Sequence, residues 1–189
     1  MSEARRVATY DDLRRLPPHV IGEIIGGEVH VSPRPAPKHA YAGTKVAFDL
    51  SGVGRRRGPG PGGWIILFEP ELHLGDDVLV PDIAGWRRAR LPEVPNTAAI
   101  TLAPDWVCEV LSPSNGRRDR LLKMPLYAAA GVGHLWLVDP DQQTLEVYRR
   151  EGAHWLLLVT HAGDQRVRAE PFVELELDLF EWWTGPEPT

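Results

Sequence analysis

Two acidic residues stand inside apolar segments of this chain, where a carboxylate needs a partner. Asp82 follows Pro81 in VPDIAGW, and Glu109 lies in VCEVL, a run typical of a buried strand. A buried, unpaired carboxylate costs several kcal/mol or gives up its charge. On neighbouring strands, the two acids could bind a divalent cation such as Mg²⁺ or Mn²⁺ through oxygen. Waters and a backbone carbonyl, that of Val110, would complete its shell.

Each acid also has a simpler interpretation. An aspartate after proline is commonly a strand-end residue, and a buried glutamate is commonly tied to an arginine. Because side chains alternate along a strand, Asp105 is expected on the same face as Glu109. The sequence therefore leaves open whether these acids bind a cation or only hold the fold together.

Length and composition favour one compact domain. The chain has 189 residues, of which 43% are hydrophobic and 25% charged. No stretch approaches the roughly 20 apolar residues of a membrane span, and the N-terminus lacks the apolar core of a signal peptide. We therefore expect a cytoplasmic protein without a membrane partner. The single Cys108 excludes an internal disulfide, and the histidines show no zinc-binding spacing.

The charge pattern gives mixed indications about nucleic acid. A net charge of -5 argues against binding through the overall field, although local basic patches can still hold a phosphate backbone. The simpler interpretation of each patch is a solvated face. The arginine clusters are 55–57, then 87, 88 and 90, then 117, 118 and 120.

Hydrophobic periodicity and turn residues predict a mixed order of helices and strands. We expect a short helix after Thr9, a hairpin around Gly26 and Gly27, and a β extension with a short helix at the C-terminal end. Between them, the sequence predicts helices at 37–57 and 119–130, and strands at 64–68 continuing into 71–74, at 78–86, at 105–111 and at 134–139. This order indicates an α/β or α+β domain.

Several motifs in this order carry a family resemblance. The segments GEIIGGEVHVSP, PAPKHA, VPDIAGW, APDWVCEVLSPSN, RRDRLLKMPLYAAAGV and HLWLVDP resemble the Uma-type restriction endonucleases, a family of the PD-(D/E)XK nuclease superfamily. The likeness covers most of residues 10 to 183. It implies a single domain over 1–189, with a restriction-endonuclease-like core at about 36–140, a helix and hairpin at 9–33 and a C-terminal extension at 144–183. The implied core is a central mixed β-sheet flanked by helices, with additional antiparallel strands.

The same resemblance implies roles for particular residues. Asp82 would be the metal-binding aspartate and Glu109 the acid of the E-x-K element. The lysine position of that element is filled by Leu111, and the resemblance implies that Lys123 in the following helix supplies the lysine instead. A solvated helix lysine is the alternative. The resemblance also marks Glu28, His39, Asp105 and Asp139, with less defined roles. Other acids that could join the site are Glu23, Glu69 and Glu71, and of all these additional acids Glu28 ranks first.

Three functional hypotheses follow. The first is a magnesium- or manganese-dependent endonuclease that hydrolyses DNA, with Asp82, Glu109 and Lys123 catalytic and a homodimer helping an acidic chain to hold its substrate. The second is a binding or structural protein that keeps the nuclease fold without activity. The third is an enzyme acting on a small phosphate compound, for which the sequence offers no nucleotide-binding motif.

Overall fold

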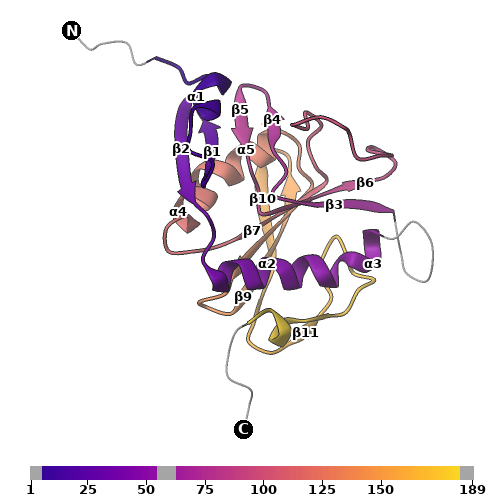
Figure 1. Cartoon of the computed structure of the whole chain (residues 1–189). Coiled ribbons are helices and arrows are strands. Elements are labelled where there is room, and N and C mark those ends of the chain that lie inside the picture. Colours follow the sequence, from indigo (N-terminus) through magenta and orange to yellow (C-terminus); the bar gives the residue numbers. More distant parts are fainter. Residues whose placement is uncertain (1–5, 55–62, 184–189) are drawn as a thin grey trace.

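The computed structural model describes residues 6–54 and 63–183 and shows a mixed α+β fold, which confirms the predicted class (Figure 1). Its first half contains α1 (Tyr10–Arg14), β1 (Val20–Ile25), β2 (Glu28–Pro33), α2 (Pro37–Asp49), α3 (Ser51–Gly54), β3 (Trp64–Phe68), β4 (Leu72–Leu74), β5 (Asp77–Leu79) and β6 (Ile83–Arg87). The second half contains β7 (Trp106–Val110), α4 (Gly116–Arg118), the π-helix η1 (Asp119–Lys123), α5 (Met124–Ala129), β8 (His134–Asp139), β9 (Thr144–Glu151), β10 (His154–Ala162), β11 (Arg166–Val167), β12 (Leu177–Asp178) and the 3-10 helix η2 (Leu179–Trp182).

The main sheet has six strands in the order β10-β9-β8-β7-β6-β3. Strands β7 and β8 are parallel, whereas the other neighbouring pairs are antiparallel, so the sheet is mixed as predicted. The parallel pair requires a crossover, which α4, η1 and α5 supply. This connection places the helix that carries Lys123 beside the end of the strand that carries Glu109.

A smaller antiparallel sheet, in the order β2-β1-β5-β4, packs against the main sheet through a shared hydrophobic cluster that includes Leu72, Leu79 and Trp86. Its hairpin turns at Gly26 and Gly27, whose φ angles of 59° and 78° suit glycine in a tight hairpin turn. Strand β1 pairs with β5 through Ile24 and Val78. The hairpin predicted from the sequence is thus present, and its second arm leads directly into α2 (Figure 1).

The strand predicted at 78–86 is wrong as a single element. It divides into β5, which belongs to the small sheet, and β6, which belongs to the main sheet. Pro81 has no N–H to donate to a ladder, so the chain leaves one sheet there and joins the other. Similarly, the predicted continuation of 64–68 into 71–74 is interrupted at Glu69, where φ is 45°. Both breaks lie next to Asp82.

Hydrophobic side chains fill both faces of the main sheet, in the alternation expected for a buried strand. Along β7, Trp106, Cys108 and Val110 pack toward α2, whereas Val107 belongs to the cluster that contains Tyr127 of α5. Glu109 shares the second face with Val107. Its carboxylate therefore points toward the crossover helix.

The predicted helix at 119–130 begins with a wide turn. The N–H of Met124 bonds to the carbonyl of Asp119, five residues back, and α-helix resumes from Met124. Pro125 explains the wide turn, because its ring would clash with the carbonyl four residues earlier in a regular α-helix. The wide turn buries both Asp119 and Lys123.

Three further observations concern the outer parts of the fold. Helix α2 ends at Asp49 and α3 follows at Ser51–Gly54, so the helix predicted at 37–57 divides into two, whereas its last residues, the arginines 55–57, and most of the glycine-rich loop lie outside the described residues. Strand β10 forms an open edge of the main sheet and exposes Leu156 and Leu157. In the described ranges, no helix is long and apolar enough to span a membrane.

Candidate functional site

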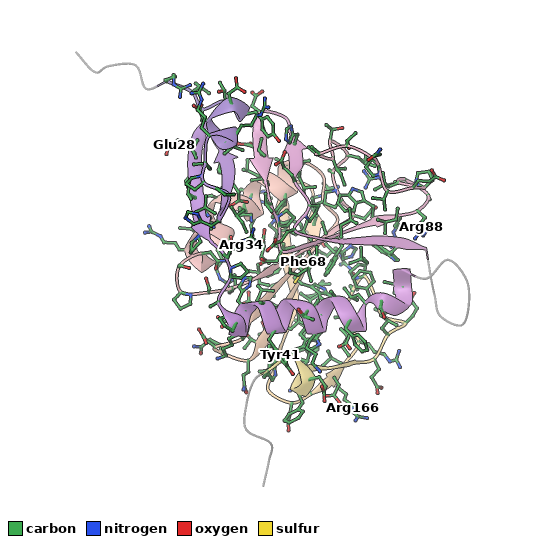
Figure 2. The ribbon with its side chains drawn as sticks, in the orientation of Figure 1. Glu28, Arg34, Tyr41, Phe68, Arg88 and Arg166 are labelled. Atoms are coloured by element: carbon green, nitrogen blue, oxygen red, sulfur yellow. The ribbon has the colours of Figure 1, made fainter. Side chains whose placement is uncertain are left out.

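A cavity of about 320 Å³ lies between the β1–β2 hairpin, the start of α2, the end of β7 and the crossover helices. Residues 32–36 and residues 112–115 both line this cavity. Arg34, labelled in Figure 2, lies where the hairpin passes into α2. The titratable residues that line this pocket are Glu23, Arg34, His39, Asp82, Glu109, Arg118, Asp119 and Lys123.

The ammonium of Lys123 is at the centre of the pocket's polar contacts. It lies 2.8 Å from Oε1 of Glu109 and 3.0 Å from Oε1 of Glu23, and it donates to the carbonyl of Val80 at 3.1 Å. Its side chain is only 3% exposed. Burial alone would lower the pKa of Lys123, but the surrounding carboxylates outweigh burial and raise it. Lys123 is therefore a charged, buried cation and not a solvated helix lysine.

Glu109 projects from β7 into this cluster. Its Oε1 atom contacts Lys123 and accepts a hydrogen bond of 2.6 Å from the hydroxyl of Tyr127. Burial raises the pKa of the Glu109 carboxyl, while the Lys123 ammonium opposes the shift. The contacts of Glu109 within the described residues use one oxygen and leave Oε2 for another ligand.

The side chain of Asp82 accepts a hydrogen bond where the ladder between β6 and β7 ends. Its Oδ2 atom accepts the backbone N–H of Val110 at 2.6 Å, just beyond the last β6–β7 pair, and lies 3.3 Å from Nε2 of His39. Burial lowers the pKa of His39, but the hydrogen bond and charge of Asp82 outweigh burial and leave the pKa raised. The predicted pair Asp82 and Glu109 thus lines one pocket. Val110 connects them, because it follows Glu109 in the chain and donates its N–H to Asp82.

Asp119 is a buried acid that the sequence did not single out. Its side chain is 1% exposed, and Oδ1 lies 3.9 Å from the Lys123 ammonium. Burial raises the pKa of Asp119 to about 6, an effect that Lys123 opposes and Asp82 reinforces. Asp119, Lys123 and Tyr127 recur every four residues and are all buried, so this spacing was an available sequence signal.

Glu23 and Arg118 complete the wall of the pocket. Oε1 of Glu23 accepts the backbone N–H of Val80 at 2.9 Å, and Oε2 lies 3.7 Å from Nε of Arg118. Arg118 also donates to the hydroxyl of Ser32. The hairpin is thereby tied to the crossover helix across the pocket.

Other residues marked in the sequence lie outside this pocket. Glu28 is at the turn end of the hairpin, well away from Arg34 in Figure 2. Asp105 precedes β7 at the end opposite Val110, where it accepts the N–H of Arg87 and pairs with Arg90. Asp139 caps a turn by accepting the N–H groups of residues 141 and 142, beside a neighbouring hollow.

The two other candidate acids differ in position. Glu69 lies close to Asp82, since the Glu69 N–H donates to the Asp82 carbonyl. Burial raises the pKa of the Glu69 carboxyl, and the charge of Asp82 raises it further. Glu71 instead pairs with His73 on the small sheet. Leu111, at the lysine position of the E-x-K element, lines the neighbouring hollow.

Most arginines of the two described clusters have structural partners. Arg87 stacks on Trp64 with 4.6 Å to the ring centroid, and Arg88 donates to the carbonyl of Gly54. Arg120 forms a bidentate pair with Glu146 at 2.6 and 2.8 Å. Arg34 and Arg117 remain exposed near the pocket and can meet an anionic partner.

The donor set suits a hard divalent cation. Among the described residues, no group of three or more His, Cys, Asp or Glu side chains is arranged to hold a metal ion. A cation in this pocket would therefore be bound by carboxylate oxygens, a backbone carbonyl and waters. Mg²⁺ prefers such oxygen ligands. The pocket is lined by four carboxylates and by three permanent cations, Arg34, Arg118 and Lys123, together with His39, so an added cation would be partly balanced by the acids when His39 is neutral.

Comparisons with known proteins agree with the mixed α+β fold. The model of the Uma2 family, described as "Putative restriction endonuclease", matches residues 7–179. A solved structure from Anabaena variabilis ATCC 29413, titled a putative nuclease belonging to DUF820, is similar with a TM-score of 0.72 and 29% sequence identity. The similarity covers 93% of this chain and 98% of that chain. A search of curated proteins gave no match.

Proposed function

Because the chain belongs to the Uma2 family, which is described as "Putative restriction endonuclease", we propose that it is a metal-dependent endonuclease that hydrolyses phosphodiester bonds in DNA. The observation that carries the proposal is the meeting of Asp82, Glu109 and Lys123 in one pocket. A strand-end acid, a buried strand acid and a helix lysine converge there from three separate segments. Acidic residues that only stabilise the fold would not have to line one shared cavity.

Asp82 and Glu109 would hold the cation through the oxygens that other groups leave open. Oδ2 of Asp82 is fixed by Val110 and His39, and Oε1 of Glu109 is fixed by Lys123 and Tyr127. Oδ1 of Asp82 and Oε2 of Glu109 are the proposed ligands, and the carbonyl of Val110, which accepts a long hydrogen bond of 3.5 Å from the Asn115 amide, would have to exchange that contact to join them. When bound, the cation lowers the pKa of a coordinated water and draws charge from the scissile phosphate.

The other residues position these ligands and carry charge. His39 and the Val110 N–H orient Asp82, and the Tyr127 hydroxyl orients Glu109, as residues around metal ligands commonly do. Lys123, held charged by Glu23, would stabilise negative charge that develops on the phosphate or orient the attacking water. Arg34 and Arg117 would contact neighbouring phosphates of the strand.

Asp82→Asn tests the proposal, since it removes a charged ligand at nearly constant volume. We expect calorimetric titration with Mn²⁺ to show strongly weakened binding, and nicking of supercoiled plasmid in Mn²⁺ to be lost. Asp105→Asn is the matched control, because Asp105 lies outside the pocket, and it should retain both properties. Cleavage that survives in Asp82→Asn would identify a contaminating nuclease. A wild type that binds Mn²⁺ without cleaving DNA, or that neither binds Mn²⁺ nor cleaves DNA, would favour a binding or structural protein with a nuclease fold.

A further inference from the structure

Asp119 differs from the other acids of the pocket in having no hydrogen bond. Glu23, Asp82 and Glu109 each accept one at 2.9 Å or less. Neither carboxylate oxygen of Asp119 has a hydrogen-bond partner among the described residues, although the side chain is 1% exposed. Buried carboxylates in native proteins are normally hydrogen-bonded, so this one calls for a partner outside the chain.

The nearest cation cannot satisfy Asp119. The Lys123 ammonium lies 3.9 Å from Oδ1, beyond hydrogen-bond distance, and already contacts Glu23 and Glu109 at 3.0 and 2.8 Å. Arg118, the neighbouring residue, is directed to Ser32 and Glu23. The charge of Asp119 is therefore the least compensated in the pocket.

The pocket has room for what Asp119 lacks. Its volume of about 320 Å³ compares with about 30 Å³ for one liquid water, so it accommodates a hydrated ion. Mg²⁺ keeps several of its waters when bound, and such waters are strong hydrogen-bond donors to a carboxylate. Asp119 lines the pocket together with both proposed metal ligands, Asp82 and Glu109.

We propose that Asp119 is a third carboxylate of the cation site, accepting hydrogen bonds from water molecules bound to the ion that Asp82 and Glu109 coordinate. The inference rests on the proposed function. It adds Asp119 as a positioning residue that binds the hydration shell of the ion. Loss of such an outer contact typically lowers metal affinity about 10- to 100-fold.

The test measures metal binding and stability on the same variant. Asp119→Asn keeps the shape but removes the charge, so affinity for Mn²⁺, measured by calorimetry at about pH 8, should fall about 10- to 100-fold. In chelator, the urea midpoint of Asp119→Asn should rise, because an uncompensated buried charge is gone. Asp119→Glu, which retains the charge, should recover part of the affinity. Asp105→Asn should behave oppositely: its midpoint should fall because it loses the pair with Arg90, and its metal affinity should stay unchanged.

Three results would overturn the inference. Unchanged Mn²⁺ affinity in Asp119→Asn, with the wild type binding the ion, refutes it and leaves the proposed function intact. A lower urea midpoint of Asp119→Asn in chelator would make Asp119 a structural partner of Lys123. A wild type that binds no divalent ion refutes both this inference and the metal dependence of the proposed function.

Discussion

Lys123→Met replaces the ammonium at the centre of the pocket with an apolar side chain of similar length. Packing should change little, because the two side chains have similar volumes. Glu23 and Glu109, with side chains 3% and 2% exposed, lose the cation that they share at 3.0 and 2.8 Å. Removing one partner of a buried pair costs about 3–5 kcal/mol, because the remaining charge stays uncompensated. This is a large part of a typical domain stability of about 5–15 kcal/mol.

Urea unfolding followed by tryptophan fluorescence measures the loss, since Trp86 and Trp136 are fully buried. The double variant Lys123→Met with Glu109→Gln should recover about 0.5–3 kcal/mol, because it also removes one uncompensated charge. Glu109→Gln alone provides the second arm of the cycle if Lys123→Met is too unstable to purify. A loss below about 1 kcal/mol, or no recovery in the double variant, would refute the ion-pair interpretation.

Two further predictions address the pH dependence and the core. The raised pKa of His39 means that its contribution to stability is fully present below about pH 6.5 and is lost as the pH rises through the folded-state pKa. Asp82→Asn should lower that pKa, and an unchanged NMR titration of the His39 ring would contradict the pairing. Gly85→Ala should cost about 1–3 kcal/mol in urea unfolding, because its Cβ would lie 2.9 Å from Cδ1 of Ile66 and 3.1 Å from Trp106. A cost below about 0.5 kcal/mol would contradict the tight packing of β6 against these side chains.

The strands and their faces could be predicted because they follow from local alternation of apolar residues, whereas the mixed sheet was implied only by the family resemblance. The sequence could not predict the break at Pro81 as a change of sheet, since β5 joins the small sheet by pairing with the distant β1, whereas β6 pairs with β3 and β7. The convergence of Lys123 with Glu109 was expected only from family resemblance. Periodicity alone left the direction of Lys123 open, because Pro125 was expected to disturb the helix.

The additional acids show where sequence reasoning was least informative. Glu23 and Glu28 lie on the two arms of the same hairpin, and their local patterns are similar. Only the docking of β1 on β5 brings Glu23 to Lys123 and leaves Glu28 at the turn end. Whether any of these acids acts in catalysis stays a prediction.

The wide turn of η1 makes the pocket depend on chain length as well as on residue type. Each residue of an α-helix advances the chain by about 100°, so deletion of one residue between 119 and 124 would rotate one side of the turn relative to the other. Tyr127 anchors α5 in the core, which leaves the preceding segment to rotate relative to the pocket. A single gap in this turn would therefore change the direction in which Asp119 faces the pocket, even where both Asp119 and Lys123 are retained.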